Sequence, residues 1–413
     1  MKRCFIFFSF LLIKFSLQSQ STSFINYVDT LTSNYFKGRG YVANGHGKAA
    51  VFLSNEYREI GLDSLSRKSY LQSFKIDVNT FPKKVALKIN GKKLIPGEDF
   101  IVEPYSGSAV GVYNVSSVNL NNWKSYLSVD ERSIRNFLIL NVSEVANKDT
   151  LSRYNEIKNI LNKHYPILWV SSKKLQWSVA EFYNLFPVIN IKSDVIKEPI
   201  TTLNIEVENE FKKSLETQNI VGKLKGKRKK TIIISAHYDH LGMMGELMFP
   251  GANDNASGVS LLLNLASYYS KKKPKYNLVF ICFGAEEVGL LGSKYFVNNP
   301  LINLDNVKLL VNLDIVGTGE DGIAIVNAFE QEKATKIIGK INEKVKYFPK
   351  IKLRGQAPNS DHFWFSKKNV PALFIYTMGG IKAYHDPLDI AKTLPLNKVD
   401  ELQSLIIKLV SSL

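Results

Sequence analysis

Cysteine is almost absent from this chain of 413 residues, which has only Cys4 and Cys282. One disulfide would need both, and Cys4 lies in an amino-terminal stretch that we expect to be removed, so the mature chain is predicted to have none. Cys282 lies in the apolar run NLVFICFG and is predicted to be a buried, unreactive thiol. Stability must therefore come from a hydrophobic core, for which 45% apolar residues suffice.

Long apolar runs are also missing. No segment has the roughly 18 consecutive apolar residues that a membrane-spanning helix needs. The first residues have Lys2 and Arg3 before an apolar stretch from Cys4 to Ile13, followed by small and polar residues. This layout is typical of a secretory signal peptide, which we place at residues 1–19. We expect an exported protein, periplasmic or secreted, with no membrane span after its removal.

Acidic residues are scarce beside basic ones, with 37 Asp and Glu against 54 Lys and Arg and a formal charge of +17. Such an excess can serve nucleic-acid binding. The basic clusters at 225–230 and 271–275, however, read as exposed connections next to predicted strands, and no nucleic-acid-binding motif is present. We therefore predict no nucleic-acid partner.

Strands and helices alternate over residues 201–413. Strand-like runs occur at 231–236, 276–284, 307–317, 322–328 and 371–377, and helical patterns at 255–273, 330–345 and 396–413. Nearly continuous apolar strands that alternate with helices predict an α/β fold, in which helices flank a mostly parallel central sheet.

Two other regions differ in pattern. Residues 81–200 contain Asn90-Gly91 between short apolar runs, a strong hairpin signal, and several further short strand-like runs. We predict that they form a smaller β-rich inserted domain. Residues 20–80 are predicted to be a helical part that packs on the α/β domain.

Imidazoles and carboxylates follow the predicted strands of the α/β domain. They are His237 and Asp239 in HYDH, Asp254 in GANDNASG, Glu286 and Glu287 in GAEEVGLLGS, Asp314 in NLDIVG and His385 in YHDPLD. Each has a simpler explanation on its own, as a turn residue, a helix cap or a first-turn acid. Together they point to one site, because ligands bind where loops leave the carboxyl ends of such strands.

These residue types suit a divalent metal ion, since zinc binds imidazole and carboxylate at about 2.0–2.2 Å. One ion with three protein ligands would leave some of the residues unused. Two ions would use all of them if one carboxylate bridged the pair, and with a hydroxide the core would be neutral. Paired ions about 3.5–4 Å apart stabilise hydrolytic transition states.

The motifs HYDHLG, GANDNASG, FGAEEVGLLGS, NLDIVG, SDHFWF and YHDPLD resemble, in this order, those of metallopeptidase family 28. This family includes zinc aminopeptidases related to bacterial leucyl aminopeptidase, glutamate carboxypeptidase and the non-catalytic transferrin receptor. The resemblance covers most of the chain and implies a zinc-exopeptidase-like fold. It also places the inserted region where many members carry a protease-associated domain.

The resemblance implies a role for each site residue. Asp254 would bridge two Zn²⁺ ions, with Co²⁺ or Mn²⁺ as alternatives. His237 and Asp314 would complete one ion, Glu287 and His385 would complete the other, and Glu286 would be the general base. A cis peptide is expected after Asp254. Asp239, two residues after His237, is expected to accept the second ring N–H of that histidine. His240 and His362 are candidates for supporting roles near the site.

The function that these expectations describe is a dinuclear zinc aminopeptidase acting on the N-termini of peptides or proteins, with Glu286 taking a proton from a metal-activated water. Three alternatives remain open. A carboxypeptidase of the glutamate-releasing type is one of them, although no arginine cluster for a substrate carboxylate is identified in the sequence. A glutaminyl cyclase would share the fold and use one zinc ion, and a non-catalytic binding protein could be built on a peptidase scaffold. Residue specificity, oligomeric state and the role of the insert are not predicted.

Overall fold

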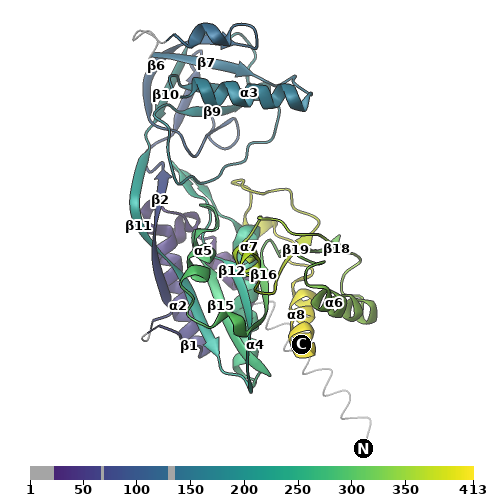
Figure 1. Cartoon of the computed structure of the whole chain (residues 1–413). Coiled ribbons are helices and arrows are strands. Elements are labelled where there is room, and N and C mark those ends of the chain that lie inside the picture. The colour runs from purple at the N-terminus through teal and green to yellow at the C-terminus, as the bar shows by residue number, and fades with distance from the viewer. Residues whose placement is uncertain (1–22, 67–68, 129–134) are drawn as a thin grey trace, which may run out of the picture.

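The computed structural model describes residues 23–66, 69–128 and 135–413, so the predicted signal peptide at 1–19 lies outside the described part. Within these ranges, no helix is both long enough and apolar enough to cross a lipid bilayer. A large body built on one sheet carries a smaller β-rich body at one end, and the long strands of the large sheet's edge run toward the smaller body (Figure 1).

Nine strands form the large sheet, in the order β1-β11-β15-β12-β16-β19-β17-β18, with β2 also paired to β11. Their bounds are β1 Asp63–Ser64, β2 Leu71–Thr80, β11 Glu210–Leu224, β12 Arg228–His237, β15 Tyr276–Phe283, β16 Val307–Leu313, β17 Gly322–Val326, β18 Ile351–Leu353 and β19 Ala372–Met378. The central strands β15, β12, β16 and β19 are parallel neighbours. The predicted α/β class with a mostly parallel central sheet is therefore confirmed.

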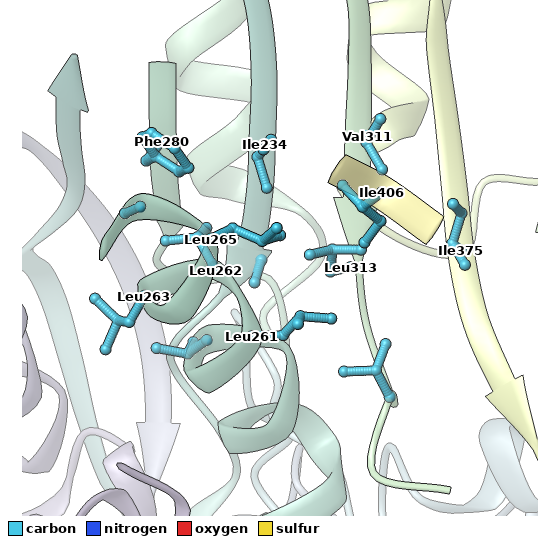
Figure 2. Packing of buried hydrophobic residues seen from close by; sticks show 14 of the residues in the cluster. Ile234, Leu261, Leu262, Leu263, Leu265, Phe280, Val311, Leu313, Ile375 and Ile406 are labelled. Carbon is cyan, nitrogen blue, oxygen red and sulfur yellow. The ribbon is translucent and has the colours of Figure 1, made fainter. Parts of the chain in front are cut away.

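Helices cover both faces of this sheet. They are α2 Gly45–Ile60, α4 Ser257–Ser270, α5 Leu291–Asn298, α6 Glu332–Val345, α7 His362–Lys367 and α8 Val399–Ser412. Side chains alternate along a strand, so Ile232 and Ile234 of β12 face the core under α2, α4 and α8, whereas Ile233 faces the core under α5 and α7. Figure 2 shows the leucines of α4 packed close to Ile234 and Phe280. Cys282 is buried and free, as predicted.

The smaller body has a sheet of eight strands, in the order β4-β3-β10-β6-β7-β8-β9-β5. Their bounds are β3 Ala86–Ile89, β4 Lys92–Leu94, β5 Phe100–Val102, β6 Ala109–Val118, β7 Asn136–Asn141, β8 Ile167–Ser171, β9 Val188–Lys192 and β10 Leu203–Val207, and helix α3 spans Lys148–Leu161. Asn90 and Gly91 both have positive φ in the turn between β3 and β4, so the predicted hairpin is confirmed.

Two boundaries differ from the sequence predictions. Within the predicted helical part, 20–80, residues 23–31 and α2 are helical, but β2 is a strand. Its buried and exposed positions alternate from Phe74 to Lys75 to Ile76, which is the period of two that a strand requires. The predicted end of the insert at residue 200 is also wrong for the sheet, because β10 pairs with β3 and β6.

Candidate metal centre

The candidate residues gather at the carboxyl edge of the parallel strands. His237 is the last residue of β12, and Asp314 directly follows β16. Glu286 and Glu287 come three and four residues after the end of β15, which ends level with β12. The other two approach from loops, with Asp254 just before α4 and His385 after β19. Parallel strands that end together therefore bring distant parts of the chain to one place.

Asp254 lies between the two histidines. Its Oδ1 is 3.3 Å from Nε2 of His237, and its Oδ2 is 3.3 Å from Nε2 of His385. Asp314 lies 3.2 Å from the same nitrogen of His237, and Glu287 lies 3.3 Å from that of His385. The predicted cis peptide is present between Asp254 and Asn255. The arrangement is a chain of alternating acids and imidazoles with Asp254 at its centre.

Backbone carbonyls determine which ring nitrogens face the acids. Nδ1 of His237 is 3.1 Å from the carbonyl oxygen of Asp239, and Nδ1 of His385 is 2.9 Å from that of Trp177. A carbonyl only accepts, so each Nδ1 carries a proton, and in a neutral ring Nε2 turns its lone pair toward the carboxylates. Lone pairs and carboxylates repel each other unless a cation lies between them.

A metal ion fits this arrangement of donors. Two atoms that each lie about 2.0–2.1 Å from one tetrahedral zinc ion are about 3.3–3.4 Å apart. The imidazole–carboxylate separations here are 3.2–3.3 Å. Among the residues that the structure describes, two groups have ligand atoms within 4.8 Å of one another, namely His237 with Glu286 and Asp314, and His237 with Asp254 and Glu287.

Without a metal, protons must compensate the acids. Burial lowers the pKa of His385, but the charge of Glu287 and bonds to Glu287 and Asp254 outweigh it and raise that pKa to about 11. The pKa of His237 is likewise raised well above its usual value despite burial. Burial raises the pKa of Glu287, yet the nearby His385 and His240 hold it at about 2. Metal ligands must give up such protons, so the site binds either protons or metal.

Glu286 differs from its neighbour. Burial raises its pKa more than the charge of His237 lowers it, and the nearby acids Asp361, Glu287 and Asp314 raise it further. Two adjacent carboxyl groups whose pKa values are pushed apart are suited to different roles. Glu287 is held as a carboxylate, whereas Glu286 is able to take up a proton.

The expected bond from the Asp239 carboxylate to His237 is not made. Nδ1 of His237 contacts the carbonyl of Asp239, and the nearest carboxylate oxygen is 4.0 Å away. The carboxylate instead accepts the N–H groups of Glu286 at 3.1 Å and Glu287 at 3.4 Å, and the hydroxyl of Tyr41 at 3.2 Å. Asp239 therefore orients the turn that carries both glutamates, and the backbone orients the imidazole.

Several supporting residues were not predicted. Ser360 donates to Asp314 at 2.8 Å, and Asp389 accepts the N–H groups of Asn253 and Asp254. The motifs SDHFWF and YHDPLD contain both and were the available signal. His240 lies 2.7 Å from Glu287, in keeping with a supporting role, whereas the ring of His362 faces Phe374.

Arg39 is a fully buried charge beside the site, with no exposed surface. It donates to the carbonyls of Tyr238, Pro250 and Gly251 at 2.7–2.8 Å. These carbonyls belong to the two loops that deliver the site residues, so Arg39 ties those loops together.

A cavity of about 430 Å³ opens beside the candidate ligands. Its lining includes Glu286, Tyr384, Tyr376 and Leu290, together with Ser178 from the smaller body. Among the described lining residues, Arg354 is the only lysine or arginine. A cavity of this volume is the size of a small organic ligand or one to two amino-acid residues.

Fold and site define an α/β protein with a buried imidazole–carboxylate centre suited to divalent metal ions. Residues 219–410 match the model of peptidase family M28. The matched part of the chain contains every candidate ligand, and the match bears out the resemblance to this family that the motifs predict.

The chain is also similar to parts of curated proteins. Aminopeptidase YwaD of Bacillus subtilis (strain 168) is 37% identical over 140 residues, which are 32% of this chain and 29% of that protein. A glutaminyl-peptide cyclotransferase of Drosophila melanogaster is 25% identical over 263 residues, 53% of this chain and 73% of that protein. For YwaD and the other most similar curated relatives, the chain spans less than a third of the relative's length.

A solved zinc aminopeptidase from Bacillus subtilis shares the fold over both chains, with a TM-score of 0.68, 19% identity and coverage of 95% of this chain and 94% of that one. A solved peptidase M28 precursor from Shewanella amazonensis SB2B has a TM-score of 0.71, 13% identity and coverage of 96% and 95%.

Proposed function

We propose that this protein is an exported aminopeptidase that holds two zinc ions at the centre built on Asp254. The observation that carries the proposal is the position of Asp254, which presents one oxygen to each of two imidazoles. Asp314 would complete the ligands of one ion with His237, and Glu287 would complete those of the other with His385. Bound zinc ions would supply Lewis-acid activation of water and of the scissile carbonyl.

Glu286 would move the proton. Its carboxyl group faces the same space as His237 and Asp314 and is not needed as a ligand in this assignment. The raised pKa that its surroundings impose makes it able to accept a proton from the attacking water and to pass it to the leaving amine.

The cavity supports an exopeptidase. It opens directly beside the candidate ligands and Glu286, so the free α-amine of a peptide bound there would have a zinc ion and a carboxylate within reach. A cavity of about 430 Å³ accommodates the end of a peptide rather than a folded segment. We therefore infer that the substrates are the N-termini of peptides or unfolded chains.

A glutaminyl cyclase is the second candidate, because the chain resembles the cyclotransferase of Drosophila melanogaster over about half its length. That reaction is expected to need one zinc ion, whereas the two sets of ligands around Asp254 favour two. A non-catalytic binding protein is disfavoured because every candidate ligand is retained.

The test uses the purified mature chain. We expect about two zinc ions per chain by elemental analysis and hydrolysis of aminoacyl-nitroanilides that stops with chelator and returns with zinc. One ion per chain and cyclisation of N-terminal glutamine would identify the cyclase, and no metal and no turnover would identify the binding protein.

Two further proposals concern the organisation of the chain. Residues 1–19 are proposed to direct export and to be removed, which sequencing the amino terminus of protein from the periplasm and the medium would test. The β-rich region beginning near residue 81 is proposed to be an inserted domain, since it has its own sheet and a buried cluster of its own.

A further inference from the structure

The smaller body contacts the candidate metal centre at His385. The N–H of Trp177 donates to the carbonyl of His385 at 3.0 Å, and Nδ1 of His385 donates to the carbonyl of Trp177 at 2.9 Å. The residues are 208 positions apart in the chain. The two bonds fix both the backbone and the ring of His385, because each acts on a different part of the residue.

Neighbours of Trp177 hold the same loop. Nζ of Lys174 lies 2.6 Å from the carboxylate of Asp386 and donates to the carbonyl of Lys382 at 2.7 Å. Gln176 donates to the carbonyl of Tyr384 at 3.4 Å. Residues 174–178 therefore run alongside the loop at 379–390, which we call the histidine loop.

The histidine loop has little structure of its own. No helix or strand lies within residues 379–390, all of which are described. His385 itself has φ of 51°, a left-handed conformation that a residue other than glycine keeps only when its surroundings impose it. Among the described residues, the hydrogen bonds that act on its ring Nδ1 and its carbonyl come from Trp177.

Trp177 is in turn firmly anchored. Its side chain is 5% exposed, and its Nε1 donates to the carbonyl of Val102 in β5 at 2.8 Å. Its ring stacks on Phe249 with the centroids 4.7 Å apart. Phe249 ends β14 (Leu247–Phe249), which pairs with β13 (Gly242–Met244) just after the HYDH motif. Trp177 thus joins the smaller sheet, the hairpin after β12 and the histidine loop.

We propose that Trp177 is a positioning residue for the metal centre, through which the inserted region orients His385 before any metal binds. The inference rests on the proposed function in one respect, that His385 binds a metal ion. It gives the insert a role in the site, because the larger body alone lacks the backbone groups that hold this ligand. Partners of this kind are worth about 10–100-fold in metal affinity.

The test compares Trp177→Ala and Trp177→Phe with Trp169→Ala. Trp169 is 8% exposed in β8 of the same sheet and belongs to a different buried cluster, so it is the matched control for destabilising the insert. Zinc affinity is measured by competition with a chromophoric chelator. Hydrogen exchange over residues 379–390 is measured on the metal-free full chain.

We expect Trp177→Ala to weaken binding of one zinc ion by about 10–100-fold and to speed exchange in the histidine loop. Trp177→Phe keeps the stacking ring and loses the hydrogen bond to Val102, so its zinc affinity and exchange rate should lie between those of Trp177→Ala and wild type. Lys174→Met removes a partly exposed ion pair and should weaken zinc affinity by at most about fivefold. Trp169→Ala should lower the melting temperature and leave both readouts unchanged.

The proposal is overturned if Trp177→Ala binds zinc as tightly as wild type, or if Trp169→Ala has the same effect on affinity and exchange. Should Trp177→Ala not fold, Trp177→Phe decides, and the proposal is overturned if this variant matches wild type in zinc affinity and in exchange of the histidine loop. If the wild type binds no zinc but Trp177→Ala still speeds exchange in the loop, the contact stands and the proposed function is wrong.

Discussion

Asp254 and His385 meet at 3.3 Å, and the second oxygen of Asp254 lies equally far from His237. One carboxylate thus serves two imidazoles that are delivered by different loops. Hydrogen bonds from the two histidines hold the pKa of Asp254 well below its usual value, although burial acts in the other direction. Loss of this charge therefore affects both halves of the centre at once.

Asp254→Asn should reduce the zinc content from about two ions per chain to less than one, because an amide cannot bridge two cations as a carboxylate does. Elemental analysis after dialysis against dilute zinc measures this. Asp314→Asn is the comparison, since it should remove only one ion. Retention of both ions in the Asp254 variant would disprove the bridging role.

Glu286→Gln should lower kcat by about 10²–10⁴-fold, the usual contribution of a general base, while zinc content stays at the wild-type level. The adjacent Glu287→Gln serves as a control and should lose metal as well as activity. Nitroanilide kinetics combined with metal analysis distinguishes the two. A Glu286 variant with full activity would remove this residue from proton transfer.

The stability of the metal-free protein should fall as pH rises from about 6.5 to 9. The folded pKa of His385 is raised to about 11, whereas the unfolded value is about 6.5. The folded state therefore binds a proton that the unfolded chain has released, and the stability present below pH 6.5 is lost as pH rises toward 11. The pKa of Glu287 is lowered to about 2, so the stability that this carboxylate contributes is present at neutral pH and is lost only in acid.

Thermal melts from pH 6 to 9 in chelator measure this decline. Zinc replaces the protons, so the gain in melting temperature on adding zinc should increase with pH. A gain that is constant or shrinks across this range would show that the imidazoles are not protonated in the metal-free site.

Arg39→Met should lower the free energy of unfolding by about 3 kcal/mol or more, because several buried carbonyls lose their donor at once. Arg39→Lys should rescue little, since a lysine cannot donate in several fixed directions. Urea denaturation measures both. Arg58→Met on the exposed side of α2 is the control and should change stability by less than about 0.5 kcal/mol.

The sequence predicted the position of the candidate site where a potential metal ligand stands at the end of an apolar strand. Apolar strands that end in His237 or Asp314 predict both the sheet and the edge at which the site lies, because the same residues carry both signals. The sequence prediction was wrong at Asp239, because either the backbone carbonyl or the side-chain carboxylate of this residue can accept a bond from His237. The structure shows that the carbonyl does. A spacing of two residues cannot distinguish these groups.

The contact of Trp177 with His385 could not be predicted for a related reason. Every residue has a backbone carbonyl, so nothing in the sequence marks this one as a partner of a residue 208 positions away. β2 was missed because it lies in a segment that begins with two helical stretches, and its alternation is confined to a few residues. Tertiary pairing with β11 determines its conformation.

The pairing of β2 with β11 has a mechanical consequence. β11 has 15 residues and spans about 50 Å, so the two strands form a stiff ribbon toward the smaller body (Figure 1). Its register shifts between Lys212 and Leu215, where Ser214 has φ of 52° and its N–H bonds to Asp77. An irregularity of this kind bends the strand locally and increases its twist. The direction in which the ribbon reaches the smaller body is therefore set at Ser214, between the larger sheet and the region that supplies Ser178 to the cavity.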